Sequence, residues 1–221
     1  MNLMVLAAEV PIRTSLFSIA SKGGFLMIIL FIISLAALSI IISKLLQIKK
    51  AQKTEIEFLQ EIYGYIGDKK SEIAIRMCEE RTGSPIASII AKAMAAMGRT
   101  MEETKEVIEV AVNKEIHQLE KGLGTLATFA AVAPLIGFLG TVTGMVKVFM
   151  RLGETGGGVD ISLLANGIWE ALITTIGGLT VGIITILFYN YLIGKVEDLA
   201  RELEENINEF IYNIRGIKND Y

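Results

Sequence analysis

Three long stretches without a charged residue divide the chain, at Gly23–Ser43, Gly122–Val146 and Ala171–Gly194. They contain 21, 25 and 24 residues. At about 1.5 Å per residue, a helix of any of these lengths crosses a hydrocarbon core of roughly 30 Å. The pattern therefore predicts an all-α, polytopic membrane protein. We place its three transmembrane helices at residues 23–43, 122–150 and 166–194.

Basic residues are unevenly divided between the two sides of this predicted membrane. Eight Lys or Arg residues flank the spans on one side: Lys44, Lys49, Lys50, Lys53, Lys114, Lys121, Lys195 and Arg201. Four lie on the other side: Arg13, Lys22, Lys147 and Arg151. Cytoplasmic flanks are enriched in Lys and Arg, so we expect the N-terminus on the outer, periplasmic side of the membrane and the C-terminus in the cytoplasm.

The remaining segments follow from this topology. Residues 1–22 form a periplasmic N-terminal segment, in which 10–22 is either a short interfacial helix or an ordinary linker. Residues 44–121 form a cytoplasmic helical domain with turns near 67–70 and 81–85. Residues 151–165 are expected to form a periplasmic loop, and 195–221 a cytoplasmic C-terminal helix.

Two of the three spans are predicted to continue into the cytoplasm. Thr100 followed by Glu103 is a capping-box pattern that opens a helix near Met101, which we expect to run on through the second span unless Gly122 or Gly124 interrupts it. The third span has no Pro and continues into an amphipathic charged stretch. The two extensions predict a cytoplasmic helical bundle.

Composition excludes several classes of function. Single copies of Cys78 and His117 exclude a disulfide framework, a Cys-based zinc site and a His cluster within the chain. A net charge of −3 without a basic block argues against a nucleic-acid surface. The Gly-rich run 153–158 lacks the Gly-Lys-Ser/Thr ending of a phosphate-binding loop. We find no nucleophile–base pair, so we expect no enzyme, no metal site and no cofactor.

Spans two and three differ from span one in carrying both Gly and Thr. Gly140 and Gly144, like Gly178 and Gly182, are four residues apart, a spacing that lets helix backbones approach closely. A Thr hydroxyl in a membrane helix usually bonds back to its own helix. Thr141 and Thr175 are nevertheless predicted at similar depths, roughly 8–9 Å inside the outer interface. Two hydroxyls at one level could solvate an ion or pair with a guest carboxyl group.

The uncharged cores contain no Asp, Glu, Lys, Arg or His. If the chain conducts protons, a carboxylate must therefore come from another chain. Glu170, beside Trp169, is the one acid at the edge of a span. It is either an interfacial charge in an aromatic belt or a group at the outer end of a pathway between the spans, where it pairs with Lys147 or Arg151.

Two motifs resemble one known family. The segment Ala133–Met145 (APLIGFLGTVTGM) resembles the second-span signature of the TolQ/ExbB/MotA proton-channel proteins, and Gly167–Thr175 followed by Gly177–Leu179 resembles their third span. The closing run Phe188–Tyr191 is also similar to that family. Three spans and one large cytoplasmic segment resemble the ExbB/TolQ branch.

The resemblance implies a homopentamer around a single-span partner of the ExbD/TolR type, whose membrane Asp carries protons past a ring of Thr residues. By this match the proton-pathway residues are Thr141, Thr174, Thr175 and Glu170. The helix-packing residues are Pro134, Gly137, Gly140, Gly144, Gly178 and Gly182.

These expectations define a leading function and two alternatives. The leading one is a proton-channel subunit of an inner-membrane motor that converts the proton motive force into work, delivered through a TonB- or TolA-like protein to outer-membrane processes. The first alternative is a stator-type unit for another machine, in gliding, secretion or flagellar-like motion. The second is a non-conducting membrane scaffold.

Overall fold

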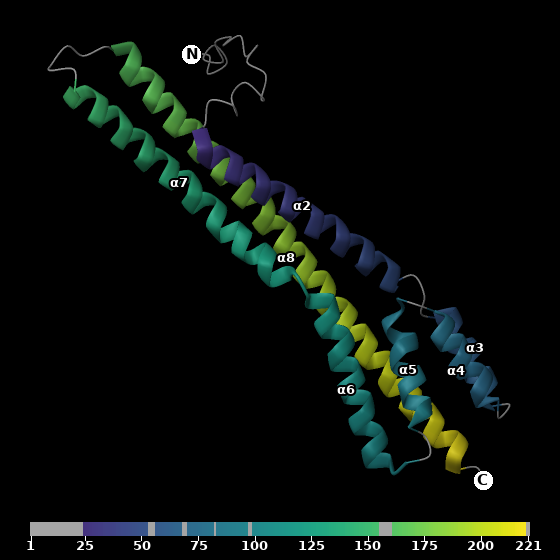
Figure 1. Cartoon of the computed structure of the whole chain (residues 1–221). Helices are drawn as coiled ribbons and strands as arrows, with labels where there is room; N and C mark the ends of the chain where they lie inside the picture. The colour runs from purple at the N-terminus through teal and green to yellow at the C-terminus, as the bar shows by residue number, and fades with distance from the viewer. Residues whose placement is uncertain are drawn as a thin grey trace, which may run out of the picture. The chain divides into compact units, whose positions relative to one another are not determined.

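The computed structural model describes residues 24–52, 56–67, 70–81, 83–96, 99–154 and 161–219 (Figure 1). Its helices are α2 (Gly24–Gln52), α3 (Ile56–Gly67), α4 (Ser71–Glu80), α5 (Pro85–Ala95), α6 (Met101–Glu120), α7 (Leu123–Glu154) and α8 (Ile161–Asn219). Within the described residues there is no strand, and the all-α prediction is confirmed. The interfacial helix considered for 10–22 lies outside the described residues, as does most of the Gly-rich run.

Three helical stretches are long and apolar enough to cross a membrane: Gly24–Ala51, Glu102–Glu154 and Leu164–Asn213. They coincide with the three uncharged stretches, so the polytopic membrane prediction is confirmed. Large apolar side chains on one side of α2 are at least half exposed, including Phe25, Phe31 and Leu35. Exposure of such a row of apolar side chains to water is unfavourable, so this face of α2 suits contact with lipid.

The chain divides into two compact units. Unit 1 consists of Met1–Ala37 and Thr128–Ile186, and unit 2 of Leu38–Ala127 and Leu187–Tyr221. Unit 1 therefore holds the greater part of the apolar stretches, whereas unit 2 holds α3 to α6 and the charged half of α8.

Unit 2 begins and ends its helices with local signals that the sequence carries. Thr100 and Glu103 form a complete capping box, in which the Thr100 amide donates to Glu103 Oε2 at 3.0 Å and the Glu103 amide donates to Thr100 Oγ1 at 3.3 Å. Ser84 caps α5 and Pro85 is its first residue. The predicted capping box is confirmed. Helices end at Gly67 and Glu80 and begin again at Ser71 and Pro85, on either side of the predicted turns near 67–70 and 81–85, and residues 68, 69 and 82 of these turns lie outside the described residues.

A row of apolar side chains along α8 provides one side of the unit 2 core. Its members recur every three or four residues and are almost completely buried: Leu192, Val196, Leu199, Leu203, Ile207 and Phe210. This spacing keeps them on one face of the helix. Tyr63 of α3 stacks near Phe210 with ring centroids 5.9 Å apart, so α3 packs against the end of α8.

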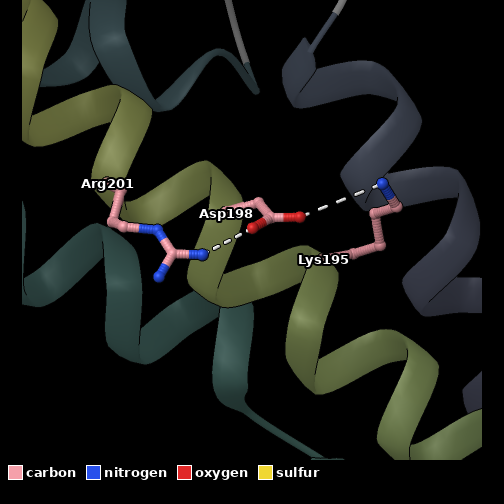
Figure 2. Close-up of polar contacts among 3 residues, drawn as sticks. All are labelled: Lys195, Asp198 and Arg201. Carbon is pink, nitrogen blue, oxygen red and sulfur yellow. Dashed lines mark hydrogen bonds and ion pairs between the residues drawn. The ribbon is translucent and has the colours of Figure 1, made fainter.

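The opposite, solvated face of α8 carries charged side chains. Figure 2 shows Asp198 between Lys195 and Arg201, with its carboxylate 4.0 Å from the Lys195 ammonium and 2.6 Å from the Arg201 guanidinium. All three side chains are well exposed, so these pairs stabilise the helix only slightly.

The single helix expected from Met101 through the second span is interrupted. Helix α6 ends at Glu120 and α7 begins at Leu123. Gly122 between them has φ +94°, a left-handed conformation that glycine adopts without strain and that commonly ends a helix. Gly122, one of two glycines predicted as possible breaks, is therefore the actual one.

Candidate functional site

Helices α7 and α8 lie side by side in unit 1 and touch through glycines (Figure 1). A Cβ added to Gly137 would lie 3.1 Å from the Cα atoms of both Gly178 and Thr175. A Cβ on Gly140 would lie 2.5 Å from Cγ2 of Thr174, and one on Gly144 would lie 2.9 Å from Cβ of Ala171. The contacts at Gly140 and Gly144 are closer than real Cβ atoms allow, and those at Gly137 are tighter than most real Cβ contacts, so a larger residue at any of the three would require its neighbours to move.

The α8 side of this interface is equally tight. A Cβ on Gly178 would lie 2.6 Å from the Ala133 carbonyl oxygen, and one on Gly182 would lie 2.5 Å from Cγ of Pro134. Pro134 has no N–H to donate to the carbonyl of Ala130 four residues earlier, and that oxygen also faces Gly182. We call this interface the α7–α8 seam. It contains Pro134, Gly137, Gly140 and Gly144 of α7 with Gly167, Ala171, Thr174, Thr175, Gly178 and Gly182 of α8.

The contacts of the seam fix how the two antiparallel helices are aligned. Gly137 faces Gly178, Gly140 faces Thr174, and Gly144 faces Ala171. Interpolating between these pairs places Thr141 and Thr175 within about two residues, or roughly 3 Å, of the same level along the helices. The two hydroxyls singled out from the sequence therefore occupy neighbouring depths.

Thr175 binds across the seam. Its Oγ1 donates to the Gly137 carbonyl oxygen at 2.7 Å, a hydrogen bond between residues 38 apart in the chain. Thr174 is almost completely buried, and its Oγ1 donates at 3.0 Å to the Glu170 carbonyl oxygen of its own helix. The Thr175 hydroxyl therefore links α8 to α7.

Thr141 follows the common pattern for a membrane helix. Its Oγ1 donates at 2.7 Å to the Phe138 carbonyl oxygen three residues earlier. The structure thus brings Thr141 and Thr175 to one level but binds their hydroxyl protons to different carbonyls. Each hydroxyl oxygen keeps its capacity to accept a hydrogen bond, because a hydroxyl has one proton and two lone pairs.

Glu170 has a neighbour that its sequence context did not suggest. A Cβ on Gly24, the first residue of α2, would lie 2.7 Å from Glu170 Oε1. The carboxylate therefore lies beside the start of α2, whose first-turn N–H groups and positive dipole end favour an anion. Gly24 has φ +66°, so both its conformation and its neighbour favour glycine. Glu170 is placed to hold the beginning of α2 against α8.

Sequence reasoning missed one buried charge in unit 2. Lys44, expected only as a topology-determining charge, is 6% exposed. Its Nζ donates to Gln47 Oε1 at 2.8 Å and to the Gln118 carbonyl oxygen at 3.1 Å. The ammonium thus satisfies a carbonyl at the C-terminal end of α6, where cations are favoured. The one available signal was its position as the first charge after a span, three residues before a Gln.

Fold and seam together define a class: a multi-pass α-helical membrane protein whose second and third spans pack through glycine around hydroxyl groups. The sequence model of the MotA/TolQ/ExbB proton channel family matches residues 81–205, which is more than half of the chain. The protein belongs to this family.

Three relatives illustrate the match. A putative biopolymer transport protein ExbB homolog of Methanothermobacter thermautotrophicus is 37% identical over 121 residues, covering 55% of this chain and 42% of the relative. The putative ExbB-like 3 protein of Synechocystis sp. is 31% identical over 173 residues, covering 76% and 80%. The Tol-Pal system protein TolQ of Haemophilus influenzae is 37% identical over 107 residues, covering 48% and 46%.

These relatives place the chain on the ExbB/TolQ branch of the family, as its sequence resemblance predicts. The matched part spans less than half the length of the Methanothermobacter and Haemophilus proteins. The family match covers all of the α7–α8 seam and Glu170, whereas Gly24 and Lys44 of α2 lie outside the matched residues.

Proposed function

We propose that this chain is the channel subunit of a proton-driven motor in a bacterial inner membrane, and that a second protein supplies the proton-carrying carboxyl group. One observation carries the proposal. The Thr175 hydroxyl bridges α7 and α8 within stretches that contain no Asp, Glu, Lys, Arg or His. The seam offers hydrogen bonds to a proton carrier but has no group of its own that could take up a proton.

The chemistry of Thr175 suits a carboxyl group that changes protonation state. While its proton is donated to Gly137, the hydroxyl oxygen can accept a hydrogen bond from a neutral carboxylic acid. An ionised carboxylate needs donors instead, which requires the hydroxyl to turn away from the Gly137 carbonyl. That carbonyl lies within helix α7 and keeps its place in the helical ladder. Loss of a proton by the guest would therefore release the bond that ties α7 to α8 at this level.

This exchange suggests how proton movement reaches the protein backbone. A neutral guest leaves the seam bonded, and an ionised guest competes with Gly137 for the Thr175 proton. Thr141, at nearly the same level, offers a second hydroxyl that can respond in the same way. Thr174 is buried and bonded within α8, so we assign it a packing role beneath the pathway.

The remaining parts of the proposal follow the family resemblance. A single-span partner of the ExbD/TolR type provides the membrane Asp, and several copies of this chain, in a pentamer, surround it. The work is delivered to TonB- or Tol-type processes at the outer membrane. We place the N-terminus in the periplasm and the C-terminus in the cytoplasm, and we assign no enzymatic activity, cofactor or metal to the chain.

Proton uptake into liposomes tests the proposal directly. The chain is co-purified and reconstituted with its single-span, Asp-bearing partner, and uptake is measured under an imposed potential. Thr175→Val removes the hydroxyl at nearly constant shape and should abolish most of the flux while the complex still assembles. Thr175→Ser keeps a hydroxyl and should restore flux.

Thr180→Val is the matched control. The Thr180 hydroxyl bonds to the Ile176 carbonyl of its own helix at 2.8 Å and is exposed outside the seam. This variant should conduct normally. Normal flux in Thr175→Val would remove the proposed role of the seam. If the unmodified complex shows no flux, and cells that carry Thr175→Val have a normal phenotype, the scaffold alternative is favoured.

A further inference from the structure

Unit 2 contains a cavity of about 410 Å³ between α2, α5 and α6 that the proton pathway does not use. Its lining includes two buried apolar side chains, Ala51 and Leu119, at 1% and 7% exposure. The polar residues of the lining are Gln47, Lys50, Ser84, Ser88, Glu115 and Gln118. Apolar residues with a few polar groups among them are the usual lining of a small-ligand site.

The lining of the cavity includes groups that suit a phosphate. The Lys50 ammonium lies over Gly83, where an added Cβ would be 2.7 Å from Nζ. Ser84 and Pro85, at the start of helix α5, also line the cavity, and the start of a helix favours an anion. Lys44 binds the side-chain oxygen of Gln47, which leaves the amide nitrogen of Gln47 as the group's donor end. The Lys50 ammonium, the start of α5 and the amide nitrogen of Gln47 together suit one phosphodiester.

The position of the cavity along the helices points to the source of that phosphate. Gln47 and Lys50 lie four and seven residues after the uncharged stretch that ends at Ser43. Gln118 and Glu115 lie four and seven residues before the stretch that begins at Gly122. The two glutamines therefore lie roughly 6 Å beyond the hydrocarbon core, within the headgroup layer, which is about 5–7.5 Å thick on each side. Lys50 and Glu115 lie at roughly 10 Å, just beyond this layer, and the long side chain of a lysine can reach back toward it.

One acidic side chain decides between a lipid and a free phosphate ion. Glu115 accepts a hydrogen bond from Ser88 Oγ at 2.7 Å on the cavity wall. Its carboxylate repels a doubly charged inorganic phosphate more than a singly charged phosphodiester, and it can accept hydrogen bonds from headgroup hydroxyls. We propose that this cavity binds the headgroup of a membrane phospholipid, with Lys50 on the phosphodiester.

The test titrates the delipidated complex with phosphatidylglycerol in mixed micelles and follows its thermal unfolding midpoint. The Lys50→Gln variant should need roughly fivefold more lipid for the same rise in unfolding midpoint, because one basic residue at a membrane surface contributes about 1 kcal/mol to binding. Lys49→Gln removes the same charge one residue away, outside the cavity lining, and should titrate like the wild type. Diacylglycerol, which lacks the phosphate, should leave the midpoint unchanged in every variant.

A second variant changes the affinity in the opposite direction. Glu115→Gln keeps an acceptor for Ser88 but removes the negative charge, so it should lower the lipid requirement by a similar factor. A role of these residues in folding alone would not produce opposite shifts. Equal titrations for Lys50→Gln and Lys49→Gln, or an equal effect of diacylglycerol, would overturn the proposal. An equal effect of inorganic phosphate would overturn the lipid assignment in favour of a free-phosphate site.

Discussion

The closest backbone contact in the seam yields the sharpest prediction. Gly178→Ala places a Cβ 2.6 Å from the Ala133 carbonyl oxygen and 2.8 Å from the Gly137 Cα. Both neighbours are backbone atoms, which cannot rotate away as a flexible side chain can. The helices must therefore move apart, and the Thr175–Gly137 hydrogen bond lengthens with them.

The expected size of the effect combines three contributions. Overpacking of a close interface costs about 1–3 kcal/mol, and a hydrogen bond between membrane helices contributes about 0.6 kcal/mol. Replacing Gly by Ala inside a helix returns up to about 1 kcal/mol. The free energy of unfolding should therefore fall by about 1–2.5 kcal/mol, and proton flux should fall with it.

Gly194→Ala provides the control within the same helix. Nothing lies within 4 Å of a Cβ added at Gly194, so this change should be neutral or slightly stabilising. Trp169, the one tryptophan of the chain, lies on α8 in unit 1, and its fluorescence can follow unfolding by SDS from mild detergent micelles. Equal midpoints for Gly178→Ala and Gly194→Ala would refute the reasoning from close contacts.

Two further predictions concern unit 2. Lys44→Met removes the ammonium that binds the Gln118 carbonyl and should destabilise the end of α6 by about 1–3 kcal/mol, seen as faster hydrogen exchange there, whereas Lys49→Met should leave exchange unchanged. Burial raises the pKa of the Cys78 thiol to about 11, so at pH 8 the native protein should react with maleimide roughly a hundredfold more slowly than the unfolded chain. The difference should shrink as the pH rises from 9 through 11, because the folded thiol ionises last; equal rates at pH 8 would contradict the burial.

Local signals made much of the fold predictable. Uncharged length alone located three spans, and Thr100 with Glu103 located the start of α6. The break at Gly122 was harder to predict, because a glycine is tolerated inside a helix and also favoured beyond its end. Only the φ of +94° at Gly122 in the folded chain shows which case applies.

The seam could be predicted in its parts but not in its bonds. The spacing of Gly140 and Gly144 indicated close packing, and the depth of Thr141 and Thr175 followed from counting residues. That Thr175 bonds to Gly137 depends on the alignment of α7 against α8, which a single sequence does not contain. The contact of Glu170 with Gly24 and the hydrogen bond of Lys44 to Gln118 were equally unpredictable, because each joins residues more than 70 positions apart.

The seam also constrains how this gene can change over time. Every missense mutation of a glycine codon adds at least a Cβ, and at Gly137, Gly140, Gly144, Gly178 and Gly182 that atom meets its neighbour at 3.1 Å or less. Nearly every single-base amino-acid change at these codons should therefore be selected against. The exposed face of α2, with Phe25 and Phe31, can exchange one apolar residue for another with little penalty. Across a lineage, α7 and α8 should drift slowly at every third or fourth position, while the exposed face of α2 drifts freely.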